Sequence, residues 1–324
     1  MLFELTHETV FEYAPAAYET FMELRLTPVS DSTQQLLQHR ERVTPFRPVR
    51  QYRDCYGNTV SYFNMVERQE RIEVRFDSVV ETYDSPYRPL AVDAPSASMA
   101  ERLLVHDFLQ QTSLTEWGPE FLEFIRPLEC LRGRPVPEVA PALSGEIGGR
   151  FRYEGEVTSA QSPISDLLRE GGGVCQDFAH LMIAACRYLG YPARYVSGYV
   201  LPASGGEATA SHAWCEVYDP ERGWLGVDPT HGEKAGERHI IMGVGRDYRD
   251  VPPNRGIFRG QAEETMHVRV QLKPITRDDL GRKAVTMFPI VRDSARITRQ
   301  LRRVDGASIL EQLQLAQQQQ QQQQ

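Results

Sequence analysis

The 324-residue sequence lacks paired cysteines, long apolar runs and an excess of positive charge. Its five cysteines are odd in number and have no C-x-x-C spacing, which argues against a disulfide framework and a four-cysteine zinc site. No stretch approaches the roughly 18 consecutive apolar residues of a membrane-spanning helix. The opening residues MLFELTHETVFEY predict a strand and not a signal peptide.

The formal net charge of −8 gives no field that would attract a nucleic acid or an anionic membrane. We therefore expect a cytoplasmic protein with reduced thiols, no nucleic-acid partner and no integral membrane segment.

What is present is the composition of a soluble globular protein, with 41% hydrophobic and 25% charged residues. The length allows about two domains. Changes of pattern along the chain divide it into five parts. These are a β-rich domain over 1–92, a connector of helices and loops over 93–150, a core over 151–275, a helical extension over 276–316 and a disordered poly-glutamine tail over 317–324.

The first ninety residues predict antiparallel strands. Apolar and polar side chains alternate in TFMELRLTPV (20–29) and RIEVRFD (71–77), which is the period of a half-buried strand. Gly57 and Asn58 lie between two such runs and indicate a hairpin turn. Several short strands joined by turns favour a small β-sandwich. The side chains expected to face its core are Met22, Leu24, Leu26, Ile72, Val74 and Phe76.

The connector predicts both helix and loop. Ser98 and Glu101 have the spacing of a capping box, and apolar clusters with helical character continue to Leu131. The segment GRPVPEVAPALSGEIGG (133–149) is rich in proline and glycine, so we expect a connecting loop there.

The segment GGGVCQDFAH (171–180) leads into a well-defined amphipathic helix. Gly190 followed by Pro192 marks the end of this helix. Cys175 therefore lies in its first turn, on the side that faces the core. The helical stripe consists of Phe178, Leu181, Met182, Ala185, Cys186 and Leu189, in which Cys186 is expected to fill the core.

Two interpretations of Cys175 are open at this point. Free cysteine is among the most buried residue types, so it could be one more small core residue. A helix N-terminus, however, presents unpaired N–H groups and a partial positive charge, and both stabilise a thiolate. The glycines allow close approach to the sulfur, and the N–H of Cys175 could bind an oxyanion.

Two strands further along the chain favour a nucleophile. His212 lies in SHAWCEVYD (211–219) and Asp228 in GWLGVDPT (223–230), with the turn DPERG between them. Paired as a hairpin, these strands would bring His212 and Asp228 together on a common face. A cysteine on a helix, a base on a strand and a carboxylate that orients the base form the geometry of thiol acyl transfer.

These segments resemble the transglutaminase-like superfamily of papain-fold thiol enzymes. GGGVCQDFAHL, YPARYVSGYV, SHAWCEVYD and GWLGVDPTHG match the bacterial transglutaminase-core pattern in the right order, and GRDYRDVPPNRGIFRG (245–260) resembles the segment after that core. The β-rich N-terminus resembles the accompanying N-terminal domain, so the match covers about residues 1–275. The resemblance implies an α+β fold whose nucleophile helix packs on an antiparallel sheet, with Cys175 as nucleophile, His212 as base and Asp228 as the orienting residue.

Neighbouring residues have less specific interpretations. His231 stands where many relatives carry asparagine; it could compete for the hydrogen bond of Asp228, but a solvated loop position is favoured. His180 is expected at the surface or behind the site. Asp177 is expected to complement the helix dipole.

Tyr153 is a candidate for the second oxyanion donor. Core packing is expected for Cys215, and either core packing or a substrate cleft for Trp214 and Trp224. We expect no cofactor and no metal, because no fourth ligand has helix or knuckle spacing and no Asp-rich loop resembles a calcium site.

The C-terminal segment predicts a basic amphipathic helix near Arg292–Arg303. Such a helix can grip an acidic partner or a membrane surface, although docking on the protein's own core is favoured. Its arginines are Arg292, Arg296, Arg299 and Arg303, and its apolar stripe consists of Ile290, Ile297, Leu301 and Val304.

The sequence thus predicts cysteine-dependent acyl transfer on amide bonds of a protein or peptide substrate. Cys175 would attack the carbonyl, His212 would protonate the leaving amine, and water or a second amine would resolve the thioester. Amidase or peptidase hydrolysis is favoured over cross-linking, because water is always present and no amine site is visible. The alternatives are an amine-accepting protein-glutamine transglutaminase and a non-catalytic interaction module with a vestigial triad.

Overall fold

The computed structural model describes residues 1–88, 105–155, 158–159 and 161–280. Contacts between residues divide the chain into two units, Met1–Ile275 and Thr276–Gln324. Of the second unit only 276–280 are described, and there Thr276 and Asp279 exchange hydrogen bonds at the start of a helical turn. The predictions outside the described residues are the capping box at Ser98 and Glu101, the basic helix near Arg292–Arg303 and the poly-glutamine tail.

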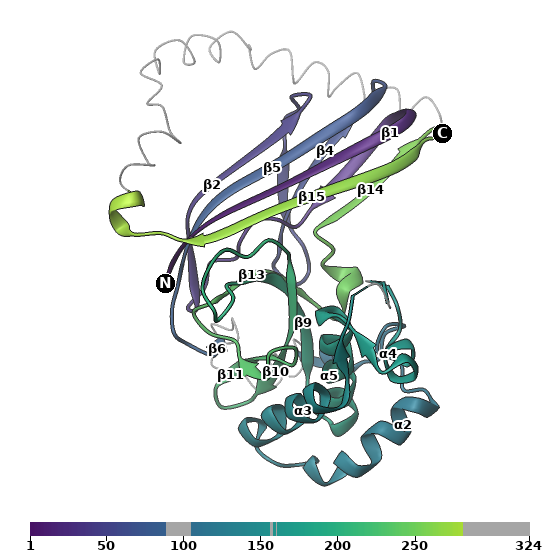
Figure 1. Cartoon of the computed structure of the whole chain (residues 1–324), viewed down its shortest axis with the longest axis vertical. Coiled ribbons are helices and arrows are strands. Elements are labelled where there is room, and N and C mark those ends of the chain that lie inside the picture. Colours follow the sequence, from purple (N-terminus) through teal and green to yellow (C-terminus); the bar gives the residue numbers. More distant parts are fainter. Residues whose placement is uncertain (89–104, 156–157, 160, 281–324) are drawn as a thin grey trace, which may run out of the picture. The chain divides into compact units, whose positions relative to one another are not determined.

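The first unit contains two large antiparallel sheets, which occupy the upper and lower parts of Figure 1. The N-terminal sheet has seven strands within the described residues. Its strand β1 pairs first with β5 and β15 and then with β4 and β14, so the sheet folds over along β1 into two layers. The strands are β1 (Leu2–Leu24), β2 (Gln34–Thr44), β3 (Arg50–Arg53), β4 (Thr59–Met65), β5 (Gln69–Thr82), β14 (Asn254–Arg259) and β15 (Glu263–Pro274).

The alternation read from the sequence is confirmed in β1 and β5. The six predicted core residues between Met22 and Phe76 are all buried, and Gly57 adopts a φ of 82° in the turn between β3 and β4. Two details differ. The predicted short strands at the N-terminus form a single strand of 23 residues. Val268 alternates with polar residues as the buried Val270 and Leu272 do, but it is 50% exposed, because the first half of β15 extends past the core.

The second large sheet packs against the helices of the C-terminal half. Its strand order is β12-β11-β10-β9-β13, with β6 paired to β11. No helix in the described ranges is long and apolar enough to cross a membrane. The strands are β6 (Tyr87–Arg88), β9 (Ala193–Val200), β10 (His212–Asp219), β11 (Gly223–Asp228), β12 (Glu233–Lys234) and β13 (His239–Gly245).

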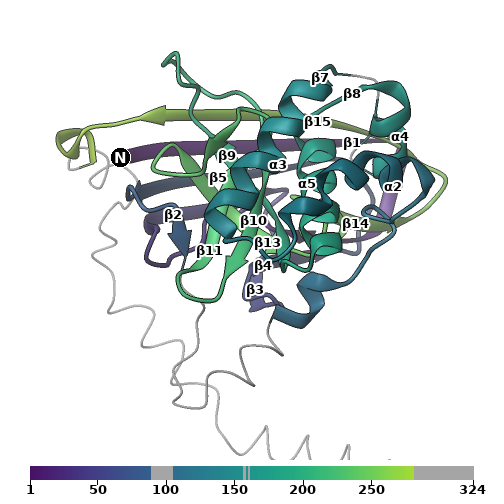
Figure 2. The ribbon, with the colours of Figure 1, turned by 90° about the horizontal axis from the view of Figure 1, so that it is seen from below.

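Helices cover one face of this sheet. Figure 2 shows α3 and α5 next to each other over β10 and β11, and both helices contact β10. A short parallel pair, β7 (Arg152–Tyr153) with β8 (Gly172–Gly173), lies just before α5. The α-helices are α2 (Pro119–Ile125), α3 (Val136–Arg150), α4 (Ile164–Glu170) and α5 (Cys175–Leu189). Short 3-10 helices are η1 (Asp107–Leu109), η2 (Arg126–Leu131) and η3 (Tyr248–Asp250).

Helix α3 corrects a sequence prediction, because residues 133–149 were expected to form a connecting loop. Proline is tolerated in the first turn of a helix, where the missing N–H has no partner to lose. Although Pro141 lies further inside α3, the apolar residues recur at helical spacing and face the core. Burial of these apolar residues stabilises the helix more than its prolines and glycines destabilise it. The buried residues are Val136, Val139, Ala140, Leu143, Ser144 and Ile147.

The N-terminal region covers the opposite face and the free edge of the second sheet. The side-chain amide of Gln34 donates to the carbonyl of Ile241 and accepts from its N–H, at 2.9 and 2.7 Å. Asn58 makes the same pair of bonds with Val244, at 2.8 Å each. These two side-chain amides bond the edge strand β13 as a further strand would, so the backbone N–H and C=O groups of Ile241 and Val244 are all paired. Strand β10 lies inside the sheet between β9 and β11, and every one of its residues is buried.

Gly198 sets the spacing between β9 and its surroundings. A Cβ atom at this position would lie 2.1 Å from the carbonyl oxygen of Ile240 and 2.5 Å from the indole of Trp214. The backbone of β13 and the ring of Trp214 therefore approach β9 only because residue 198 has no side chain.

We expect Gly198→Ala to lower the free energy of unfolding by about 3 kcal/mol, the upper end of the usual cost of overpacking, because a clash with backbone cannot be relieved by a rotamer change. Urea unfolding measures this loss. Gly145→Ala is the matched control: its Cβ meets nothing within 4 Å on the exposed side of α3. The control should gain up to about 1 kcal/mol from helix propensity. Equal stability of the two variants would contradict the packing argument.

Candidate active site

Cys175 is the first residue of α5 and is buried. Asp177 caps this end of the helix: its carboxylate accepts the N–H of Val174 at 2.8 Å and the hydroxyl of Thr158. A Cβ atom on Gly173 would lie 2.7 Å from that carboxylate, so the absence of a side chain at residue 173 leaves room for the cap. The expectation that Asp177 serves the helix N-terminus is therefore met by a direct hydrogen bond.

The predicted hairpin brings His212 and Asp228 together. β10 and β11 pair antiparallel, and His212 Nε2 donates to Asp228 Oδ2 at 2.7 Å. His212 begins β10 and Asp228 ends β11, so both side chains lie at the end of the sheet nearest the start of α5. An interaction with Cys175 contributes to raising the pKa of His212, so the sulfur lies close to this ring. Because Nε2 faces Asp228, Nδ1 is the ring nitrogen available to the sulfur.

The contacts of His212 decide its charge. Burial alone would lower the pKa of His212, but hydrogen bonds to Asp228 and Cys175 outweigh burial and raise the pKa to about 10. For Asp228, burial opposes ionisation, yet hydrogen bonds from His212, His231 and His239 hold the pKa of the carboxyl well below its usual range. The pair is therefore an imidazolium beside a carboxylate at neutral pH.

Asp228 has two further histidine partners. His231 Nδ1 lies 2.7 Å and His239 Nε2 lies 3.4 Å from Asp228 Oδ2, while Oδ1 accepts the N–H of Thr230 at 2.9 Å. A solvated position was favoured for His231, and that expectation needs correction. Its side chain is 48% exposed, but it shares with His212 the same carboxylate oxygen. The turn after β11 folds back and places it there.

His239 was not identified from the sequence. It is almost fully buried on β13, and its Nδ1 accepts the N–H of Gly236 at 3.3 Å. The proton of the ring is thus on Nε2, toward Asp228. The only local signal was its place before the apolar run IIMGV, which does not reveal a partner 11 residues earlier.

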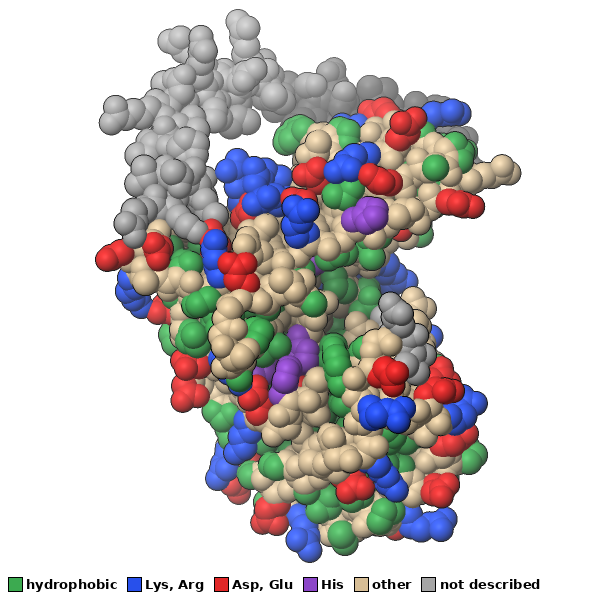
Figure 3. Space-filling model, viewed as in Figure 1, with side chains coloured by type: hydrophobic (Ala, Val, Ile, Leu, Met, Phe, Trp, Pro, Cys, Tyr) green, Lys and Arg blue, Asp and Glu red, His purple; other side chains and the backbone are tan. Residues whose placement is uncertain are grey.

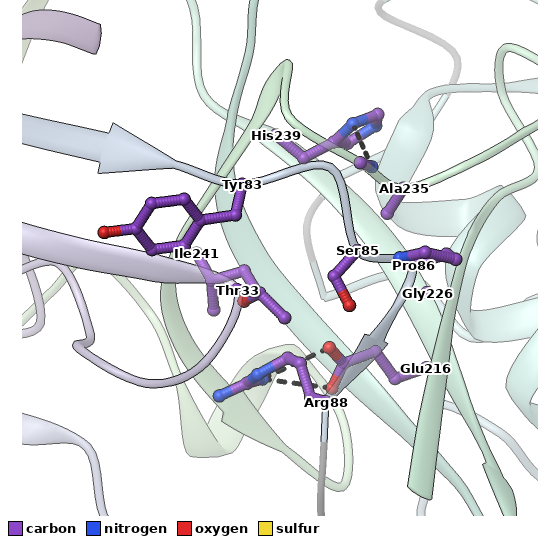
Figure 4. Close-up of a pocket in the computed structure, with 11 residues that line it drawn as sticks. Thr33, Tyr83, Ser85, Pro86, Arg88, Glu216, Gly226, Ala235, His239 and Ile241 are labelled. Carbon is purple, nitrogen blue, oxygen red and sulfur yellow. Dashed lines mark hydrogen bonds and ion pairs between the residues drawn. The ribbon is translucent and has the colours of Figure 1, made fainter. Parts of the chain in front are cut away.

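A small cavity lies behind His239 (Figure 4). Arg88 and Glu216 form an ion pair at 3.1 Å on its wall, and Arg194 binds the same glutamate at 2.6 Å. Two guanidinium groups neutralise this buried carboxylate, which sits on the face of β10 that His212 and Trp214 also occupy. This network holds β6 and β9 against β10 behind the site.

The remaining residues singled out in the sequence lie around the site and take no part in the hydrogen bonds between His212 and Asp228. Trp214 is fully buried and its ring stacks on His212 with centroids 6.2 Å apart. Trp224 is likewise buried, so core packing holds for both tryptophans. Cys186 and Cys215 are buried as predicted.

His180 is buried, so the surface position considered for it is wrong. Its ring stacks on Tyr195 and accepts the N–H of Tyr248 at 3.2 Å, and burial lowers the pKa of His180 to about 3. Tyr153, by contrast, is 60% exposed. Burial first, and then the nearby charges of Cys175 and Asp228, raise the pKa of its hydroxyl, which places Tyr153 within electrostatic range of the sulfur.

Histidine side chains lie in a hollow on the face shown in Figure 3. The ligand atoms of His212, Asp228 and His231 all lie within 4.8 Å of one another, as do those of Asp228, Glu233 and His239. Both groups could in principle hold a metal ion. The first includes the exposed His231 and is therefore open to solvent.

The class of protein to which this fold belongs is the transglutaminase-like proteins with a papain-type fold. Residues 133–229 match the transglutaminase-like superfamily, and residues 3–81 match the bacterial transglutaminase-like N-terminal region. An uncharacterized protein of Mycobacterium tuberculosis is 33% identical over 298 residues, covering 86% of this chain and 94% of that protein. One of Mycobacterium leprae is 31% identical over 276 residues, covering 83% and 97%. The chain belongs to the transglutaminase-like superfamily.

Two other similarities are informative. A protein-glutamine gamma-glutamyltransferase of Pseudomonas aeruginosa is 40% identical over 108 residues, which are 28% of this chain and 16% of that protein. The solved structure of a provisionally named cysteine protease from Cytophaga hutchinsonii has a TM-score of 0.65 and 21% identity, covering 85% of this chain and 92% of that one. The fold is thus shared, and the family supports thiol-dependent acyl transfer as the general chemistry.

Asp228→Asn tests the electrostatics of the site, because it removes the charge of the carboxylate but keeps its shape. We expect the pKa of His212 to fall in this variant, as measured by NMR titration of the ring nitrogens. Asp219→Asn, a buried aspartate at the other end of β10, is the control. A ring of His212 that titrates identically in Asp228→Asn and the wild type would contradict the assignment.

The raised pKa of His212 also predicts how the stability of the protein depends on pH. Folding raises the pKa of His212 from 6.5 to about 10, so the protonated ring stabilises the fold below pH 6.5. This contribution is lost as the pH rises through that interval. The free energy of unfolding in urea should therefore fall more steeply between these pH values for the wild type than for Asp228→Asn.

Proposed function

We propose that this protein is a thiol amidase or peptidase, with Cys175 as nucleophile, His212 as general acid and base, and Asp228 as the group that orients and charges His212. The observation that supports this most is the chain of contacts from Cys175 through the ring of His212 to Asp228 at 2.7 Å. In such a chain the carboxylate stabilises the imidazolium and fixes the orientation of the ring.

The proposed reaction has two halves. In the first, the thiolate of Cys175 attacks the amide carbon and forms a tetrahedral oxyanion. His212 gives its Nδ1 proton to the leaving nitrogen, the C–N bond breaks, and a thioester and a free amine result. In the second, His212 takes a proton from water, the hydroxide adds to the thioester, and the carboxylic acid leaves as the thiolate re-forms.

Two donors are proposed for the oxyanion. The N–H of Cys175 lies in the first turn of α5, where backbone N–H groups have no carbonyl partner within the helix. The hydroxyl of Tyr153 is the second. Hydrogen bonds from Arg152 to Gly171 and from Glu154 to Gly173 hold Tyr153 beside the chain that enters α5.

A second candidate function is amine transfer. It is favoured by the segment shared with the Pseudomonas aeruginosa protein-glutamine gamma-glutamyltransferase, which is 40% identical to this chain there. In that reaction an amine in place of water would attack the same thioester. Hydrolysis is proposed first because water reaches any open thioester, whereas amine transfer also needs a site that binds the amine and keeps water out.

We expect the full chain to cleave amide substrates from a peptide library, and His212→Ala to lower the rate about 10²–10⁴-fold, the usual contribution of a general base. Cys175→Ala should be inactive. In heavy-oxygen water the new carboxyl group should carry the label. Incorporation of a fluorescent primary amine without label would establish amine transfer instead. Two results together would favour the non-catalytic module: the same rate of Cys175 alkylation by iodoacetamide in the wild type and His212→Ala, and no cleavage of any substrate in the library.

Tyr153→Phe should lower kcat about 10²-fold with little change in KM, because an oxyanion donor acts on the transition state. Steady-state kinetics on the best substrate from the library measures the two constants. Tyr52→Phe, an exposed tyrosine on β3 of the N-terminal sheet, is the control. A change confined to KM would assign Tyr153 to substrate binding and remove it from the oxyanion site.

A further inference from the structure

One carboxylate oxygen in this protein accepts two histidine side chains at equal distance. Nε2 of His212 and Nδ1 of His231 both lie 2.7 Å from Oδ2 of Asp228. The first histidine begins β10, and the second follows the end of β11 by three residues. Asp228 is fully buried, but His231 is 48% exposed. A cation could therefore reach the group from solvent along His231.

The chemistry of these three ligand atoms is that of a zinc-class ion. Two imidazole nitrogens and one carboxylate oxygen, with a water molecule in the fourth position, form a common tetrahedral donor set. Ligands bound at about 2.1 Å around a tetrahedral ion lie about 3.4 Å apart. Each of the two contacts would have to lengthen by about 0.7 Å. The exposed His231 can provide this by rotating in its turn, and the His212 contact requires the same change of a buried ring.

The second group of candidate ligands, Asp228 with Glu233 and His239, fits a cation less well. Both oxygens of Glu233 are bound to Arg238, so this carboxylate is already neutralised. His239 Nδ1 accepts the N–H of Gly236, which puts the proton on Nε2, the nitrogen that faces Asp228. If Nε2 bound a metal, the ring proton would move to Nδ1 and face the N–H of Gly236, which is itself a donor. The site is therefore built on His212, Asp228 and His231.

We propose that His212, Asp228 and His231 form a site for a zinc-class divalent cation, and that the bound cation inhibits the thiol chemistry at Cys175. Binding replaces the protons on His212 Nε2 and His231 Nδ1, which pass to the buffer. A ring coordinated through Nε2 can carry at most one proton, on Nδ1. It cannot become the imidazolium that pairs with the thiolate of Cys175, so the inhibition rests on the proposed function while the binding does not.

The position of Cys175 distinguishes this site from ordinary capture of zinc by a thiol. The sulfur interacts with the ring of His212, whose Nε2 already faces Asp228, and it is not among the ligand atoms that lie within 4.8 Å of one another. The two nitrogens of an imidazole point away from each other. Cys175 is therefore not a ligand in the proposed site, and a cation bound there has only nitrogen and oxygen donors.

The first test is binding of Co²⁺ to the full chain, since this ion adopts the geometry of zinc and is coloured. We expect a tetrahedral visible band that saturates at one ion, without the near-ultraviolet charge-transfer band of a cobalt–thiolate bond. His231→Asn should weaken binding more than about tenfold, the lower limit for losing even an outer partner of a metal. Cys175→Ala should leave the spectrum unchanged. His267→Asn, an exposed histidine on β15, is the control and should bind as the wild type does.

Equal Co²⁺ affinity of His231→Asn and the wild type would overturn the proposal. So would a thiolate band that Cys175→Ala removes, which would place the ion on the sulfur. Far-ultraviolet circular dichroism shows whether each variant is folded, and His231→Gln replaces a variant that is not.

The second test is alkylation of Cys175 by iodoacetamide, read by peptide mass spectrometry with and without Zn²⁺. We expect Zn²⁺ to slow alkylation in the wild type, and the ratio of the two rates to approach one in His231→Asn. Zinc inhibition of the same size in both proteins would overturn the inhibitory role. If Cys175 alkylates slowly in every condition but Co²⁺ binds as described, the proposed function fails and the metal site stands.

Discussion

The carboxylate of Asp228 is the group on which the arrangement of this protein's C-terminal half depends. It has no exposed surface, and an ionised carboxylate without partners in such a place would be strongly unfavourable. Its hydrogen bonds come from β10, from the turn after β11 and from β13. Three segments must therefore be in place before the charge is stable. Closing the sheet and assembling the candidate active site are the same event.

The N-terminal region takes part in that event, because it shapes the far side of the same sheet. The amides of Gln34 and Asn58 bond the backbone of β13, the strand that carries His239. Gly198 lets Trp214 and β13 approach β9, and Trp214 in turn stacks on His212. The β-rich region is thus part of the support of the site, which explains why the two family regions occur together in one compact unit.

Much of this arrangement could be predicted from local pattern. The stripe from Phe178 to Leu189 and the glycines before Cys175 placed the sulfur at a helix start, and the turn DPERG paired the strands that carry His212 and Asp228. Local composition misled where packing overruled it. Residues 133–149 are helical despite their prolines, because their apolar residues recur at the spacing of a buried helical face. Val268 is exposed although apolar and polar residues alternate around it in β15. Alternation shows which residues share a face of a strand, and not whether another element covers that face.

The elements that could be read from the sequence have their signal within about fifteen residues: helix α5, the β10–β11 hairpin and the identities of the three residues that they bring together. The protonation and the neighbours of those residues depend on how the segments pack together. His231 and His239 meet Asp228 because a turn folds back and a separate strand arrives, and the charge of His212 follows from burial balanced against two hydrogen bonds. Such quantities depend on distances between segments remote in the chain. Periodicity, capping and turn chemistry report only on neighbours in sequence.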